Sequence, residues 1–151
     1  MRRLTSFAAC LALLAASVSV SVSAPALAEG FGPAGLLAGK NRADLPPILL
    51  SVGEPLAEAP LVLKSGTYYE IEIEADGSGE IALAGAGFFR AIWIDEIVIE
   101  GIEIRPLGLD SLEFDEAGTV EISFIAIKPG RYVLAVPGTR GDRQRLEVTI
   151  E

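Results

Sequence analysis

The stretch Thr67–Gly77, TYYEIEIEADG, decides the fold class of this 151-residue chain. Apolar residues recur at every second position, at Ile71, Ile73 and Ala75. This period of two is that of a β-strand that buries one face and exposes the other, so the sequence predicts a strand here. The exposed face would then carry a row of carboxylates about 7 Å apart. These are Glu70, Glu72, Glu74 and Asp76.

The rest of the chain after Pro47 also reads as short strands. Short apolar or alternating runs are separated by turn signals such as Lys64-Ser65-Gly66 and Lys128-Pro129-Gly130. Many short strands with regular turns are typical of a β-sandwich or barrel. No long segment has a helical period, although residues 86–93, AGFFRAIW, fit one short turn of helix. We therefore expect an all-β domain.

Two local features of the strands are also predicted. Residues 76–79, Asp-Gly-Ser-Gly, are typical of the turn of a β-hairpin. In residues 93–104, WIDEIVIEGIEI, the apolar and polar faces become mixed, and this indicates a bend or bulge near Gly101.

The first residues have the pattern of a secretory signal. Arg2 and Arg3 precede a long stretch of apolar and small residues that ends in Ala26-Leu27-Ala28. The sequence thus predicts a cleavable signal peptide over 1–28, no retained membrane span, and a periplasmic or secreted protein. Residues 29–47 are rich in Gly, Ala and Pro, so we expect a flexible N-terminal arm before a domain over 48–151.

Composition excludes several functions. Without Arg2 and Arg3, ten basic residues remain against 21 acidic ones, a net charge of −11. Such a charge repels nucleic acid and anionic lipid, so neither is an expected partner. There is no His, and the single Cys and single Met lie at Cys10 and Met1, inside the predicted signal. Zinc or haem sites and His- or Cys-dependent catalysis lack their ligands or nucleophiles, so we expect no cofactor and no enzyme.

The segment Ile127–Gln144, IKPGRYVLAVPGTRGDRQ, carries a family resemblance. A Pro-Gly turn, a Tyr-containing strand, a second Pro-Gly and a polar loop follow one another in the order used by cupredoxins. With the turns at 64–66 and 115–118, most of 48–151 resembles the cupredoxin-like domains of exported proteobacterial proteins. The resemblance implies a Greek-key β-sandwich.

The resemblance also implies where copper ligands would stand. A Cys would fall near Val136, a His at Thr139 or Arg140, and an axial Met within Asp142–Gln144. A blue-copper site needs two imidazoles and a thiolate, usually with a weak thioether, and residues 29–151 contain no His, Cys or Met to supply them. The fold is therefore carried over and the metal is not, so the chain is expected not to be a lone blue-copper carrier.

One weak hard-cation site is a candidate. Residues 72–83, EIEADGSGEIAL, follow part of an EF-hand loop, but Leu83 stands where a bidentate Glu is needed. A hairpin turn explains the same residues. The candidate ligands are Glu72, Glu74, Asp76 and Glu80.

A partner surface is expected at the end of the domain where a cupredoxin would hold its metal. Its residues are Phe88, Phe89, Arg90, Trp93, Thr139, Arg140 and Arg143. The sequence thus predicts an exported binding or accessory protein of the cell envelope, with an unidentified envelope protein as partner. Two alternatives stay open: a hard-cation-binding module that uses the carboxylate rows, and an accessory subunit of an envelope metal-transport or redox complex.

Overall fold

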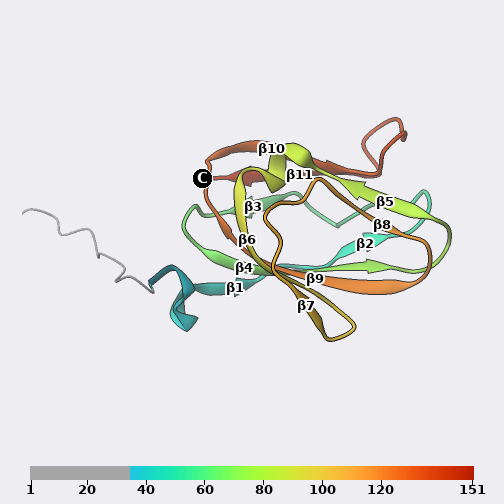
Figure 1. The fold of residues 1–151 in the computed structure, drawn as a ribbon. Helices are drawn as coiled ribbons and strands as arrows, with labels where there is room; N and C mark the ends of the chain where they lie inside the picture. Colours follow the sequence, from blue (N-terminus) through green and yellow to red (C-terminus); the bar gives the residue numbers. More distant parts are fainter. Residues whose placement is uncertain (1–34) are drawn as a thin grey trace, which may run out of the picture.

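The computed structural model describes residues 35–151, which form two packed β-sheets (Figure 1). The predicted signal peptide and the start of the predicted arm lie outside the described residues. Sheet A contains, in spatial order, β1 (Arg42–Asp44), β4 (Tyr68–Ala75), β9 (Gly118–Ala126), β6 (Ile92–Ile99) and β7 (Ile102–Ile104), with β2 (Ile48–Leu50) also paired to β4. Sheet B contains β3 (Leu61–Leu63), β11 (Arg145–Ile150), β10 (Gly130–Ala135), β5 (Ile81–Ala84) and β8 (Ser111–Phe114).

The predicted all-β sandwich is confirmed, and the chain crosses repeatedly between the two sheets, as it does in sandwiches with Greek-key connections. Short helical turns complete the described part: η1 (Gly35–Leu37), η2 (Gly39–Asn41) and α1 (Ala86–Phe89). The last of these is the helical turn that the sequence predicts. Within residues 35–151, no helix is long and apolar enough to cross a membrane.

Strand β9 forms the centre of sheet A. It pairs antiparallel with β4 on one side and with β6 on the other. Its inward side chains, Val120, Ile122, Phe124 and Ala126, are all buried. Strand β4 follows the same rule, with its apolar side chains buried and its carboxylates outside, as predicted. The hydrophobic alternation thus sets which face of sheet A packs against sheet B.

Aromatic side chains fill the space between the sheets beside α1. The rings of Phe88 and Phe124 lie 5.7 Å apart at 86°, an edge-to-face contact. Phe88 also approaches Tyr132 at 6.4 Å, while Tyr69 lies 5.9 Å from Phe124. Edge-to-face aromatic pairs add to the stabilisation that burial alone gives. Phe88 therefore belongs to the core.

The turn at 76–79 does not close a hairpin. Strand β4 before it belongs to sheet A, and β5 after it belongs to sheet B, so the predicted hairpin is wrong. The loop crosses between the sheets instead. Its shape is held by the Ser78 N–H, which donates to Asp76 Oδ1 over 2.8 Å. A local turn signal fixes the reversal but not the sheet that receives the next strand.

Of the predicted bend or bulge near Gly101, the structure has a bend at Gly101, whereas the bulge lies elsewhere in β6. Glu100 and Gly101 have φ of 48° and 78° and form the two-residue turn of the β6–β7 hairpin. Positive φ at both central residues suits the twist of such hairpins. The irregularity lies earlier, between Ile94 and Glu96, where β6 shifts register against β9.

Part of the range predicted as an arm is in the sheet. Arg42–Asp44, strand β1, pairs parallel with Tyr68–Glu70 of β4. After Pro46-Pro47, β2 continues along β4, opposite Ile73–Ala75. The edge of sheet A is therefore one extended segment interrupted by two prolines, which is where prolines are tolerated in sheets.

The burial of Phe88 gives a direct prediction. Phe88 is 4% exposed, whereas Trp93 on the outer side of β6 is 48% exposed. Replacing Phe88 by Ala should lower the free energy of unfolding by about 3–5 kcal/mol because it opens a core cavity. The matched change Trp93→Ala should cost on the order of 1 kcal/mol, since less apolar area is lost from burial. Urea unfolding of both variants tests this, and equal losses would contradict the assigned positions.

Candidate functional site

The positions implied for copper ligands all lie in the loop between β10 and β11. Val136 follows β10 directly, and its N–H donates to the Gln144 carbonyl over 3.1 Å. Thr139 Oγ1 donates to the Val136 carbonyl over 2.6 Å and so turns the chain back. Gln144 is anchored through its Nε2 to the Ser51 carbonyl at 3.0 Å. The loop is thus closed by its own hydrogen bonds.

These residues do not fit a blue-copper ion. Residues 137–143 are exposed and offer a hydroxyl, one carboxylate and two guanidinium groups. The Arg143 guanidinium lies 3.9 Å from the Glu54 carboxylate, so its positive charge faces a negative one. Copper in such a site depends on imidazole nitrogen and thiolate sulfur, and the side chains of this loop supply neither.

The residues predicted as one partner surface fall in separate places. Phe88 and Phe89 are buried in the core and form no surface, so this part of the prediction is wrong. Arg90 is exposed after α1 and lies 3.7 Å from Asp110. Trp93 is on the outer face of sheet A. The loop with Thr139, Arg140 and Arg143 extends beyond β10 and faces the loop with Glu54 (Figure 1).

The four predicted cation ligands are not gathered either. Glu72 and Glu74 stand on the outer face of β4, whereas Glu80 precedes β5 in the other sheet. Hydrogen bonds from the hydroxyl and N–H of Ser78 lower the pKa of the Asp76 carboxyl. This carboxylate therefore stabilises the turn between β4 and β5. Across residues 35–151, no three His, Cys, Asp or Glu side chains are grouped so that they could hold a metal ion.

The outer face of sheet A is nevertheless strongly acidic. Glu121 of β9 stands directly opposite Glu72 of β4. Partial burial, followed by the negative charges of Glu70, Glu72 and Glu96, raises the pKa of Glu121. The carboxylates of this face thus repel one another, because the strand period places them side by side.

One arginine relieves part of this repulsion. The guanidinium of Arg105 lies 2.9 Å from Glu96, 3.4 Å from Asp95 and 3.3 Å from Glu103. Asp95 also accepts a hydrogen bond from the Tyr68 hydroxyl over 3.1 Å. Burial raises the pKa of Tyr68, whose ring lies 4.4 Å from the guanidinium carbon of Arg42. This network stabilises one end of the face and leaves Glu121 outside it.

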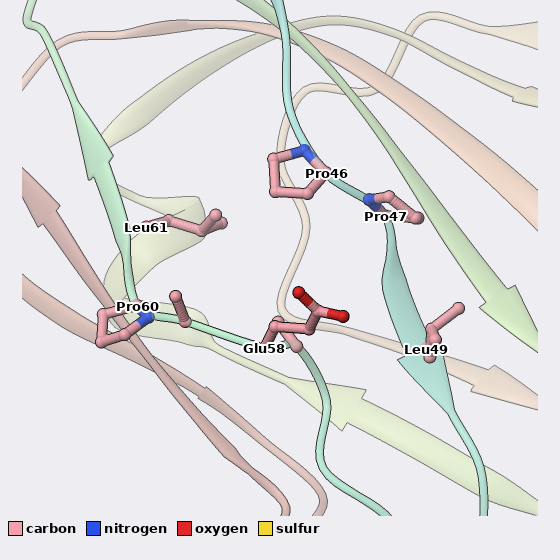
Figure 2. A pocket seen from close by; sticks show the side chains of 8 residues that line it. Pro46, Pro47, Leu49, Glu58, Pro60 and Leu61 are labelled. Atoms are coloured by element: carbon pink, nitrogen blue, oxygen red, sulfur yellow. The ribbon is translucent and has the colours of Figure 1, made fainter.

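A groove of about 420 Å³ opens between the two edge strands β2 and β3 (Figure 2). Most of its lining is apolar, and the one carboxylate, from Glu58, is directed into the space between the strands. Mostly apolar concavities of this size with few polar groups are typical of binding sites. The lining residues are Pro46, Pro47, Leu49, Ala57, Glu58, Ala59, Pro60 and Leu61.

Sequence reasoning missed this groove. Its walls come from two segments that join different sheets, β2 in sheet A and β3 in sheet B, and the sequence does not show which sheet each segment joins. A signal was present, however. Pro46-Pro47 and Pro60 flank short apolar runs, and prolines beside strands indicate sheet edges.

Comparisons with known proteins give likenesses in structure alone. No protein-family model matches the chain, and no curated protein matches its sequence. The chain is similar to a multicopper oxidase from Pseudomonas thermotolerans, with 14% identity and a TM-score of 0.49 over 62% of this chain and 22% of the other. It is similar to a copper nitrite reductase from Nitrosomonas europaea, with 16% identity and a TM-score of 0.48 over 66% and 35% of the two chains.

A blue copper oxidase from Nitrosomonas europaea is similar to the same degree, with 14% identity and a TM-score of 0.45 over 66% of this chain and 32% of the other. The chain thus spans between about a fifth and about a third of the length of the structures that it resembles. The activities in their names belong to those proteins.

The repulsion on sheet A leads to a test by pH. A raised pKa means that the folded chain holds the Glu121 proton more tightly, so stability is lost as pH rises above the ordinary value of 4.5. Glu121→Gln should therefore stabilise the fold at about pH 7 by on the order of 0.5 kcal/mol, the scale of a cross-strand pair. The gain should shrink near pH 4 and in high salt.

Thermal unfolding at both pH values measures this gain. Glu116→Gln, in the exposed turn before β9, is the matched control, since it removes the same charge away from sheet A's acidic face. Equal stabilisation by the two variants would show that net charge, rather than the local row, is responsible.

Proposed function

We propose that this chain is an exported, metal-free, cupredoxin-like binding or accessory protein of the cell envelope, without catalytic activity of its own. The observation that carries the proposal is chemical. The positions at which the resemblance places copper ligands hold Val136, an exposed hydroxyl-and-guanidinium loop, and no imidazole or sulfur. The scaffold is kept while the donor set is gone, and this favours a role in binding.

Location is part of the same proposal. Arg2 and Arg3, the apolar stretch behind them and Ala26-Leu27-Ala28 support export, and the acidic composition suits a protein that stays in solution there. The partner is an envelope protein in this proposal, not nucleic acid or anionic lipid. An accessory subunit of a metal-transport or redox complex is one form that such a protein takes.

Metal analysis tests the proposal. The chain purified from the exported fraction should contain copper far below one ion per chain and should show no blue absorption band after exposure to copper. The physical reason is that hydroxyl, carboxylate and guanidinium groups cannot replace thiolate and imidazole. Stoichiometric, tightly held copper with a blue band would overturn it.

A second candidate, a hard-cation module, is favoured by one observation. The mutual repulsion around Glu121 is of the kind that a divalent cation relieves. Calorimetric titration with calcium decides between the two functions. We expect no saturable binding at millimolar calcium, since the carboxylates stand in rows rather than in one coordination shell. Saturable binding that Glu121→Gln abolishes and Glu116→Gln preserves would establish the second candidate instead.

A further inference from the structure

We propose that the groove between β2 and β3 takes an extended segment of a partner protein, with an apolar side chain in the groove and a neighbouring Lys or Arg facing Glu58. The segment would add a strand at the free edge of β3. This inference rests on the proposed binding function and names its site and the chemistry of its partner. Three features of the described residues carry it.

The first feature is an open backbone edge. Strand β3 runs parallel to β11, and Val62 stands opposite Thr149. Two hydrogen bonds at the end of β3 show which of its residues face β11. The Glu151 N–H donates to the Leu63 carbonyl over 2.8 Å, and the Ser65 N–H donates to the Glu151 carbonyl over 2.7 Å. In a parallel pair, alternate residues face the neighbour, so Leu61 and Leu63 bond to β11.

Val62 consequently directs its N–H and C=O away from β11. Strand β3 is the edge of sheet B, and among residues 35–151 no strand pairs with its other side. Val62 is 62% exposed as a residue, so no described part of the chain covers it. Exposed sheet edges of this kind accept an extended peptide through main-chain hydrogen bonds.

Neighbouring edge groups are already paired. The Lys64 N–H donates to the Tyr69 hydroxyl over 2.8 Å. On the other wall, the Leu49 N–H donates to the Leu56 carbonyl over 2.9 Å. Pro60 has no N–H to offer. The outward N–H that remains open on β3 is therefore that of Val62, next to the groove residue Leu61.

The second feature is the shape of the groove. Proline rings line both sides, from Pro46 and Pro47 before β2 and from Pro60 before β3 (Figure 2). These rings fix the backbone, so the cavity is formed before a ligand arrives and little ordering is needed on binding. Its volume of about 420 Å³ is ample for one or two aliphatic side chains.

The third feature is charge. Glu58 supplies the one ionisable group of an otherwise apolar lining and points into the groove. Around it the chain carries a net charge of −9. A basic side chain in the bound segment is therefore favoured, and an acidic one is rejected, by the local carboxylate and by the field of the whole protein.

Selection from a displayed library of random short peptides, panned against the exported chain, provides the probe. Enriched peptides should pair an aliphatic residue with an adjacent Lys or Arg. Synthetic versions of these peptides are then titrated against three variants. Val62→Pro removes the outward N–H and leaves the β11 bonds in place; Val62→Ala keeps the N–H; Glu58→Lys reverses the charge.

Val62→Pro should weaken binding about tenfold relative to Val62→Ala, the loss expected for one hydrogen bond left unmade. Glu58→Lys should weaken basic peptides by a similar factor or more. Circular dichroism confirms that each variant is folded. Enrichment of acidic peptides, or equal binding by the Pro and Ala variants, would overturn the proposal.

Two further outcomes also decide against it. Failure to enrich any peptide would remove the site, and a dimer that Val62→Pro separates would assign the edge to a second copy of this chain. Neither outcome touches the proposed function, which fails only with the metal measurements described above. The two proposals are therefore tested independently.

Discussion

The fold depends on the ladder that β9 forms with β4 on one side and β6 on the other. Because side chains alternate across a strand, this ladder buries Ile122 and Phe124 only if Glu121 and its neighbours point outward. Burial of the apolar rows outweighs the repulsion between carboxylates, since each buried Ile or Phe contributes about 1.5–3 kcal/mol and a cross-strand pair of like charges costs less. The acidic face is thus a consequence of the core.

The margins of the sheets show a second constraint. Exposed strand edges invite pairing with other chains, and this molecule limits them. Pro46-Pro47 divides the outer strand of sheet A, and Tyr69 occupies the Lys64 N–H at the margin of sheet B. What remains is a short opening bordered by proline rings. The prolines that limit pairing at the sheet edges thus also line a concave surface.

Much of the fold was predictable from local pattern. The faces of β4 and the helical turn at Ala86–Phe89 follow from alternation and composition, which act over a few residues. The destination of the chain after Asp76 was not predictable, because both possible sheets accept the same turn. Phe88 was misplaced for a related reason. A resemblance located it near an end of the domain, but its burial depends on the distant residues Phe124 and Tyr132.

The candidate site was harder still. That residues 29–151 contain no His, Cys or Met could be read directly, since it needs only a count of residue types. The groove depends on bringing 46–49 beside 57–61 across two sheets, and the open edge at Val62 depends on the phase of its pairing with β11. The pairing with β11 joins residues far apart in the sequence, and the groove depends on which sheet receives each of two segments that are close in the sequence, so local pattern predicts neither.

The place of β11 has a consequence for how the molecule is made. This last strand lies between β3 and β10, so the early strand β3 has no neighbour in its sheet until Arg145–Ile150 has been synthesised. A nascent chain cannot complete sheet B before Arg145–Ile150 has emerged from the ribosome, and until then the apolar residues of β3 lack their partner strand. Sheet B therefore closes only after Arg145–Ile150 has emerged, so its strands cannot pair one after another in the order in which they are synthesised.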